Sequence, residues 1–433
     1  MARVLFTSAR QDGFVLPLLQ LVRAMVARGD EVWFLCGEAY RERIEAAGAT
    51  FVRMPYDAEV APGRVEHDRP RTGVGEIAEM LRSLFVDTIE PDFRTVVDLH
   101  RRLRLDLVVT EPLFLGAAAL GLLPRADRPP VLAVGLFPLP LTSPDVPLFG
   151  TGLTPLEGPF NRPRNLAVRG ATDVVGFEAV RRTIAGTIER LTGARPRGHL
   201  FDLALLADAW AQTRVPQLDY PRRDLPGRIR WVGPLPAPSD FPLPDWWDYR
   251  ERRRIVHVTQ GTYANEDFTE LVVPTIRGLA EEDVLVVATT GGPEPEAIAR
   301  AYGAPLPGNV RVERFLPYDH LLRAADVMVT NGGWGAVHHA LRHGLPLVVA
   351  GTTEDKPEVN ARVRYAGVGI DLRQQRADPA AVRAAVRRVL DERAQFRRAA
   401  AKLARAIAET DAVASVLALA DELTGAPRPA PTA

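Results

Sequence analysis

Short runs of apolar residues without polar alternation recur along the chain and indicate parallel strands buried on both faces. Between them lie segments whose apolar residues are spaced as on one face of a helix, and the first ends at Gly29, a good C-terminal cap. This order predicts doubly wound β-α-β units. In the first half we expect strands at 4–6, 31–36, 51–54, 107–110 and 131–136, and helices at 14–28, 38–47 and 74–104, the last broken near Pro91.

The same alternation returns after a proline-rich stretch that is typical of a linker. We expect strands at 255–259, 284–288, 310–314, 327–330 and 345–350, helices at 269–280, 294–302, 321–324 and 336–343, and closing helices between 379 and 423. The fold class is therefore α/β, with two Rossmann-like doubly wound parallel-sheet domains that face a central cleft. The predicted boundaries are an N-terminal domain over 1–232, a linker over 233–249, a C-terminal domain over 250–405, a helix over 406–425 placed to pack back on the N-terminal domain, and a disordered tail over 426–433.

Residues 137–163 are rich in proline, glycine and leucine and follow neither a helical nor a strand period. Loops of this length are uncommon inside a compact domain unless they serve a function. A segment this apolar is expected to line a ligand pocket. The alternative is a mobile excursion over the surface.

Charge and cysteine content exclude several classes of protein. Lys+Arg 54 balances Asp+Glu 54, which excludes electrostatic binding to nucleic acid or to an anionic membrane. Cys36 is the single cysteine, so an intramolecular disulfide is excluded. The apolar runs are far shorter than the roughly 20 residues that span a bilayer, and the first residues predict a strand rather than a signal peptide. We therefore expect a cytoplasmic protein, either a monomer or a homodimer.

Several motifs of cofactor and metal enzymes are missing. The sequence has no Gly-x-Gly-x-x-Gly after its first strand and no Gly-x-x-x-x-Gly-Lys-Ser/Thr loop, which argues against hydride transfer and ATP hydrolysis. It has no Asp-x-Asp pair to hold a divalent ion on a diphosphate. His339 and His343 share a helical spacing but lack a third ligand. We expect neither a metal nor a cofactor.

Two glycine-containing turns carry the strongest chemical signal. Residues 330–337 (TNGGWGAV) follow a buried strand and open a helix, and residues 259–262 (TQGT) follow the first strand of the same half. Glycines let a phosphate approach the main chain, and the free N–H groups and dipole of a helix N-terminus would neutralise it. The alternative is that the glycines serve only tight packing.

Together with other motifs, these turns resemble the family 1, UDP-glycosyltransferase-like enzymes of the GT-B fold, especially the actinobacterial natural-product glycosyltransferases. The resemblance covers nearly the whole chain and rests on Leu218-Asp-Tyr-Pro-Arg-Arg-Asp-Leu-Pro, Val232-Gly-Pro-Leu, Val258-Thr-Gln-Gly-Thr, Arg314-Phe-Leu-Pro-Tyr, Asn331-Gly-Gly-Trp-Gly and Gly351-Thr-Thr-Glu-Asp-Lys-Pro-Glu-Val-Asn-Ala. It implies an acceptor-binding N-terminal domain, a C-terminal domain that binds a nucleoside-diphosphate sugar as co-substrate, and metal-independent transfer with inversion.

The resemblance also assigns donor-binding residues. It implies that the pyrophosphate contacts Thr262 and the turn Asn331, Gly332, Gly333, Trp334, Gly335 and Ala336. It implies that the nucleobase lies against Phe315, Leu316 and Pro317. The sugar hydroxyls are expected to contact Asp355 and Lys356. The chain departs from the family at Asn331, where a histidine is usual, and at Ala336, where a hydroxyl residue is usual. Phosphate binding is therefore expected to depend more on main-chain N–H groups.

The largest departure concerns the general base. Phe14 occupies the position of the histidine that deprotonates the acceptor in similar enzymes, and Glu111 replaces the aspartate that orients it. Asp12 and Glu111 are the candidate bases, each with its pKa raised by a dry cleft. Alternatively, Asp12 is only a helix N-cap and Glu111 only a solvated carboxylate at a strand end.

Three interpretations of this departure stay open. A carboxylate acts directly as base, or the acceptor is an acidic phenol, an amide-type nitrogen or an electron-rich ring carbon that needs little base, or the chain has lost transfer and acts as a binding or auxiliary partner. The second is chemically feasible because general base catalysis contributes only about 10²–10⁴-fold.

We expect an inverting, metal-independent transfer of a sugar from a UDP or dTDP donor to an apolar small-molecule natural product. The sugar, the acceptor and the type of new bond stay open. Domain closure about residues 233–245 is expected to accompany donor binding.

Overall fold

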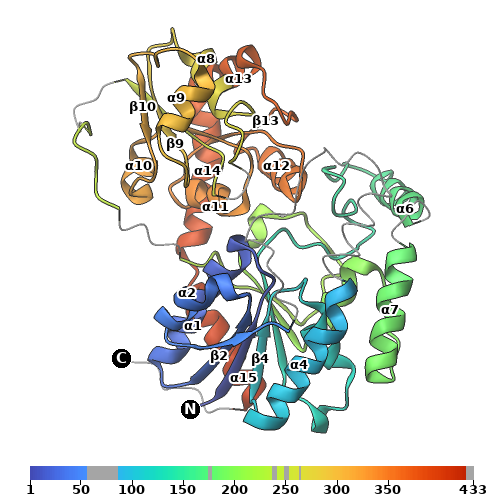
Figure 1. The fold of residues 1–433 in the computed structure, drawn as a ribbon. Coiled ribbons are helices and arrows are strands. Elements are labelled where there is room, and N and C mark those ends of the chain that lie inside the picture. Colours follow the sequence, from blue (N-terminus) through green and yellow to red (C-terminus); the bar gives the residue numbers. More distant parts are fainter. Residues whose placement is uncertain (56–85, 174–177, 237–240, 248–252, 263–264, 426–433) are drawn as a thin grey trace.

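The computed structural model describes residues 1–55, 86–173, 178–236, 241–247, 253–262 and 265–425. Two parallel sheets, each packed between helices, form an upper and a lower body in Figure 1. The predicted α/β class with two doubly wound parallel sheets is confirmed. Within the described ranges, no helix is both long and apolar enough to cross a membrane.

The N-terminal sheet has the strand order β3-β2-β1-β4-β5-β6-β7, with all neighbours parallel. Its strands are β1 (Arg3–Thr7), β2 (Glu31–Cys36), β3 (Thr50–Arg53), β4 (Leu107–Thr110), β5 (Val131–Gly135), β6 (Ala209–Gln212) and β7 (Ile229–Trp231). The helices around it are α1 (Asp12–Ala27), α2 (Arg41–Ala46), α4 (Asp87–Leu103), α5 (Leu115–Ala118) and α7 (Glu178–Thr192), while α6 (Asn161–Thr172) lies apart from the sheet, above α7 in Figure 1. Every residue of β4 and β5 is buried, as their apolar runs predicted.

The C-terminal sheet has the strand order β10-β9-β8-β11-β12-β13, also parallel throughout. Its strands are β8 (Arg254–Thr259), β9 (Val284–Thr289), β10 (Val310–Glu313), β11 (Val327–Thr330), β12 (Leu347–Val349) and β13 (Gly369–Asp371). The accompanying helices are α8 (Val272–Leu279), α9 (Glu296–Tyr302), α10 (Tyr318–Ala324), α11 (Trp334–Arg342), α12 (Lys356–Tyr365), α13 (Pro379–Asp391) and α14 (Arg393–Ala408). The central strands β8 and β11 end at the two glycine-containing turns.

The predicted helix break near Pro91 is wrong. Helix α4 runs from Asp87 to Leu103 and continues through Pro91, although the proline has no N–H to donate to the preceding turn. The apolar face of the helix, which buries Ile89, Phe93 and Val96, packs into the core and stabilises the continuous helix. The earlier part of that predicted helix, 74–85, lies outside the described residues.

The last helix, α15 (Ala412–Thr424), returns to the N-terminal sheet. It buries Val416 and Ala420 in the cluster that contains Val4 and Phe6 of β1, and in Figure 1 it lies behind the strands of the lower body. The domain boundaries themselves stay a prediction, and the proposed tail 426–433 lies outside the described residues.

The chain passes between the two bodies after β7 and again between α14 and α15, and these two connections lie side by side. Gly233, at the start of the proposed linker, has φ +84°, and a Cβ there would come 1.9 Å from Oγ1 of Thr410, which lies between α14 and α15. Only glycine fits this close approach. Residues 237–240 and 248–249 of the proposed linker are not among those described.

We expect Val416→Asp to lower the free energy of unfolding by about 3 kcal/mol, because it places an unpaired charge in the N-terminal core. Urea unfolding measures this. Ala414→Asp, on the exposed face of the same helix, is the matched control and should change stability by less than about 0.5 kcal/mol. Equal stability of the two variants would show that α15 does not stabilise the N-terminal body.

Candidate active site

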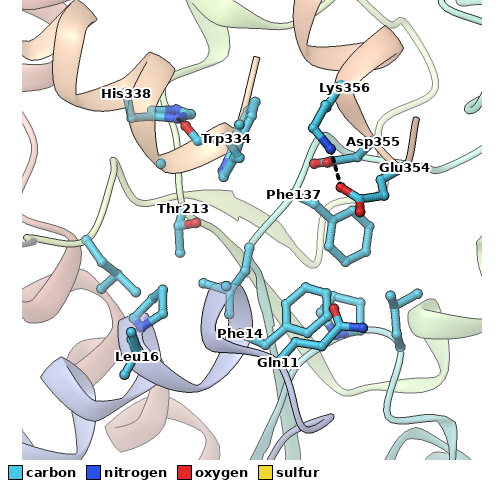
Figure 2. Close-up of a pocket in the computed structure, with 18 of the residues that line it drawn as sticks. Gln11, Phe14, Leu16, Phe137, Thr213, Trp334, His338, Glu354, Asp355 and Lys356 are labelled. Carbon is cyan, nitrogen blue, oxygen red and sulfur yellow. Dashed lines mark hydrogen bonds and ion pairs between the residues drawn. The ribbon is translucent and has the colours of Figure 1, made fainter. Parts of the chain in front are cut away.

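A cavity of about 740 Å³ lies between the two bodies and is lined by residues of both. The N-terminal body contributes mainly apolar side chains, whereas the C-terminal body contributes the two glycine turns and several ionisable groups. Figure 2 shows the division: Trp334, His338, Glu354, Asp355 and Lys356 lie above, and Phe14, Gln11 and Leu16 lie below.

Four phenylalanine rings form a continuous wall of the lower half. Neighbouring rings meet edge to face, with centroids 6.2 Å apart for Phe14 and Phe137, 6.1 Å for Phe137 and Phe149, and 5.3 Å for Phe149 and Phe201. Such contacts fix ring orientation and leave apolar surface toward the cavity. Phe137, Pro140 and Phe149 line the cavity, so the prediction that segment 137–163 lines a pocket is confirmed for them.

Asp12 does not line the cavity, although Phe14 and Gly13 do. It is the first residue of α1, and the N-cap is Gln11, so the alternative of an Asp12 N-cap is wrong. Its carboxylate lies 3.4 Å from Nη1 of Arg43 in α2. A negative charge in the first turn of a helix is favourable.

Glu111 is also outside the cavity lining, and its side chain is fully buried after β4. The alternative of a solvated carboxylate at this strand end is therefore wrong. Its two carboxylate oxygens accept hydrogen bonds from the main-chain N–H groups of Ala9 at 3.3 Å and Leu113 at 2.6 Å. Burial raises the pKa of Glu111 to about 7, against the opposing effect of these two N–H groups.

Contacts with two other segments fix the conformation of the turn between β11 and α11. Gly332 has φ +88°, and a Cβ there would come 1.9 Å from Oδ1 of Asn360. Asn331 donates from Nδ2 to the carbonyl of Gln260 at 2.8 Å, which ties this turn to the second glycine turn, and its Oδ1 accepts from Gly333 N–H. An asparagine suits this position because it donates to one turn and accepts within the other.

The beginning of α11 faces the cavity. Trp334, Gly335 and Ala336 line it, together with Thr262 of the other turn. The first N–H groups of an α-helix have no intrahelical partner, and its dipole favours an anion at this end. Burial lowers the pKa of His338 to about 3 and that of His339 to about 4, so both imidazoles are neutral at pH 7.

The loop before α12 brings three ionisable groups into the upper half. Lys356 is buried and pairs through Nζ with the carboxylate of Glu354, a contact drawn above Phe137 in Figure 2. Glu354 has φ +57°, a conformation that a residue other than glycine adopts at a cost of about 1–3 kcal/mol. Burial raises the pKa of Asp355 to about 6, although the Lys356 charge opposes this.

Comparison with known proteins places the chain in a family. The chain is 39% identical to 4'-demethylrebeccamycin synthase of Lentzea aerocolonigenes, over 98% of this chain and 99% of that protein. It is 32% identical to UDP-glycosyltransferase 2 of Phaeomoniella chlamydospora, over 92% and 90% of the two chains. Residues 279–423 match the family described as erythromycin biosynthesis protein CIII-like, C-terminal domain. The chain belongs to the family 1 natural-product glycosyltransferases.

The fold of this glycosyltransferase is GT-B, as the resemblance implied. The glycotransferase of kitacinnamycin superposes with a TM-score of 0.74 at 19% identity, over 98% of this chain and 100% of that chain. Spinosyn rhamnosyltransferase SpnG, solved with thymidine diphosphate, gives a TM-score of 0.67 at 19% identity, over 96% and 99%. At this identity, the structures establish the fold and leave the substrates open.

The segment predicted to hold the nucleobase is not brought into the cavity. Phe315, Leu316 and Pro317 are absent from its lining. The ring of Phe315 stacks on Phe241 of the proposed linker, with centroids 4.9 Å apart and planes at 8°, and Leu316 is buried in the core of the C-terminal body. A role for this edge in binding a base stays a prediction.

Sequence reasoning missed Glu354, Arg342, His338 and Phe201 of the cavity lining. Glu354 precedes the predicted sugar-binding pair directly, so its position in the chain was the one available signal. Among the residues that the structure describes, no group of three or more His, Cys, Asp or Glu side chains is placed to hold a metal ion.

We expect Gly332→Ala to weaken the binding of UDP or dTDP by about 100-fold, because the new Cβ collides with Asn360 and distorts the turn. Isothermal calorimetry measures the affinity. Gly227→Ala, where a Cβ meets nothing within 4 Å, is the control and should bind as the natural chain does. Unchanged affinity in a folded Gly332→Ala protein would remove the turn from the nucleotide site.

Proposed function

We propose that this glycosyltransferase moves a sugar from a UDP or dTDP donor to an apolar aromatic natural product, with inversion at the anomeric carbon and without a metal ion. One observation carries the proposal: a single cavity joins two glycine turns to a wall of phenylalanine rings. The names of 4'-demethylrebeccamycin synthase and of the thymidine diphosphate complex support a natural-product acceptor and a nucleotide donor.

The donor half suits an anionic diphosphate. We assign the diphosphate to Thr262 and the turn 331–336, where main-chain N–H groups and the dipole of α11 supply positive charge. Preorganised donors of this kind also stabilise the charge that develops on the leaving diphosphate. The sugar is assigned to Asp355 and Lys356, which offer an acceptor and a charged donor to its hydroxyls.

The acceptor half suits a flat aromatic molecule. Four rings and several aliphatic side chains remove apolar surface from water, and edge-to-face contacts favour a ring in the cavity. In Figure 2, Phe14 lies across the cavity from Trp334 and Asp355, and Phe137 lies just below Glu354. A nucleophile held there meets the anomeric carbon from the side opposite the diphosphate. The carbon–oxygen bond to the phosphate breaks as the new bond forms, and a single displacement of this kind inverts the centre.

The geometry favours an acceptor that needs little base. Within the described part of the N-terminal body, no ionisable side chain lines the cavity. Asp12 is paired with Arg43, and both oxygens of Glu111 accept main-chain hydrogen bonds. A phenol or an amide-type N–H that ionises near neutral pH brings no proton to remove in the transfer step. Phe14 can then serve as part of the apolar wall.

A screen of UDP- and dTDP-sugars against phenolic, N–H and alcohol acceptors, read by mass spectrometry, tests the proposal. We expect transfer to acidic acceptors in the presence of a metal chelator. The alternative of a catalytically silent, auxiliary chain predicts nucleotide binding without transfer to any acceptor, and that result would overturn the proposal.

Replacing Phe14 tests the role of the missing base. We expect Phe14→His to raise transfer to a weakly acidic alcohol by up to about 10²-fold, because an imidazole can accept the proton that the natural site leaves in place. Phe14→Leu is the control, since it keeps the wall apolar, and should give no gain. If neither variant changes the ratio of alcohol to phenol transfer, residue 14 does not face the nucleophile.

The candidate carboxylates give a separate test. We expect Asp12→Asn and Glu111→Gln to keep kcat for a phenolic acceptor within about threefold of the natural enzyme, because neither side chain reaches the cavity. Steady-state kinetics at neutral pH measures this. A loss of about 100-fold in a folded variant would restore direct carboxylate catalysis.

The raised pKa of Asp355 predicts a pH dependence of donor binding. The carboxylate of Asp355, which would accept hydrogen bonds from the sugar hydroxyls, becomes protonated as the pH falls through about 6. The affinity for UDP-glucose should therefore decrease below that pH, by about tenfold per pH unit. Asp355→Asn should bind more weakly at pH 7 and show no such decrease in calorimetric titrations. The same decrease in both proteins would assign the pH dependence to another group.

A further inference from the structure

A buried ion network crosses from the N-terminal body to α12. Asp219 accepts from Arg214 Nη2 at 2.7 Å and from Arg362 Nε at 2.9 Å, and Arg362 Nη1 donates to Glu358 Oε2 at 2.8 Å. All four side chains are at least nine-tenths buried. Asp219 and Arg214 follow β6, whereas Glu358 and Arg362 belong to α12, so the network joins the two bodies.

The other oxygen of Glu358 holds a loop of the opposite body. Its Oε1 accepts from the main-chain N–H groups of Gly150 and Gly152, both at 2.9 Å. The loop of residues 148–153, which we call the acceptor loop, carries Phe149 of the phenylalanine wall. A carboxylate that accepts two main-chain hydrogen bonds and an arginine forms strong, charge-assisted contacts.

Packing holds the acceptor loop against α12 as well. Gly152 has φ +60°, and a Cβ there would come 3.0 Å from Cβ of Pro357. Tyr220 donates from its hydroxyl to the carbonyl of Leu153 at 3.2 Å, and the guanidinium of Arg362 lies 4.4 Å from the centre of the Tyr220 ring. The acceptor loop is therefore fixed from the donor-binding side.

The network also reaches the turn 331–336 between β11 and α11, which we call the phosphate turn. The guanidinium of Arg214 lies 5.1 Å from the ring centre of Trp334, the first residue of α11. Among the described residues, its Nε and Nη1 have no hydrogen-bond partner, so its charge is compensated mainly by Asp219 and by the rings of Trp334 and of Trp231, the latter 5.2 Å away. One buried network thus connects the phosphate turn, the helix that begins at Lys356 and the acceptor loop.

We propose that Glu358 is a positioning residue that fastens the acceptor loop to α12, so that Phe149 moves with the donor-binding domain. Phe149 then keeps a fixed position relative to the proposed sugar-binding residues, and the phenylalanine wall is complete only in that arrangement. The part of this inference that concerns the molecules bound in the cavity rests on the proposed function. Attachment of the loop is a property of the protein alone.

Hydrogen exchange of the ligand-free protein tests the attachment without any substrate. In Glu358→Gln, the bond to Arg362 is lost and the two loop hydrogen bonds lose the negative charge that strengthens them. We therefore expect exchange in residues 148–153 to be about tenfold faster than in the natural chain, with β9 unchanged. Glu282→Gln, which breaks the exposed pair with Arg387, is the matched control and should leave the loop unchanged.

A second variant decides the question if Glu358→Gln does not fold. Gly152→Ala leaves every charge in place and pushes the loop away from Pro357, and we expect the same faster exchange in residues 148–153. Loop exchange within about twofold of the natural chain, or an equal increase in β9, would overturn the proposal.

Kinetics separates positioning from a merely structural role. With a working acceptor, we expect Glu358→Gln to raise the acceptor KM by about tenfold and to leave the donor KM within about twofold. Equal changes in both constants would contradict positioning. If no acceptor is ever glycosylated, the proposed function fails, while the exchange result still decides whether the loop is attached.

Discussion

The charge of a diphosphate must be met by fixed partners when it enters a cavity with apolar walls, and we assign this role to the turn between β11 and α11. Gly332 takes a positive φ that brings the main chain against Asn360, and Asn331 ties the turn to the carbonyl of Gln260. The N-terminus of α11 then presents its N–H groups to the cavity. The proposed donor site therefore depends on main-chain geometry more than on any single side chain.

A second set of charges stands behind the cavity wall. Arg214 and Arg362 both pair with Asp219 in the buried network, and Arg362 also pairs with Glu358. Burial would raise the pKa of Asp219, but Arg214 and Arg362 hold it below its usual value. These buried ion pairs are screened little by water, so they hold α12 firmly against the segment that follows β6.

The sequence predicted the architecture well where apolar periodicity is strong. The strands around β1 and β8 and the alternation with helices follow from runs that are buried on both faces. Elements without such runs were not predicted: β6, β7 and β13 are short, and α6 and α12 are polar, so tertiary contacts define them. The break at Pro91 was wrong because burial of the face that carries Ile89, Phe93 and Val96 outweighs the cost of a proline inside the helix.

For the site, sequence motifs located the turns, but side-chain environments came only from the structure. Thr262, Asn331 and Lys356 line the cavity as the motifs indicated. The burial of Glu111 and the pairing of Asp12 with Arg43 depend on how β4 and α2 pack, which no local pattern reveals. The attachment of the acceptor loop to Glu358 joins residues about 200 positions apart, a contact that one sequence alone cannot show.

A crystal structure of the protein with an intact UDP- or dTDP-sugar tests the central claim most directly. We expect the diphosphate to lie within hydrogen-bond distance of Thr262 and the main-chain N–H groups at the start of α11, with the sugar at Asp355 and Lys356 and its anomeric carbon facing the phenylalanine wall. A nucleotide bound elsewhere, with both glycine turns free, would contradict it.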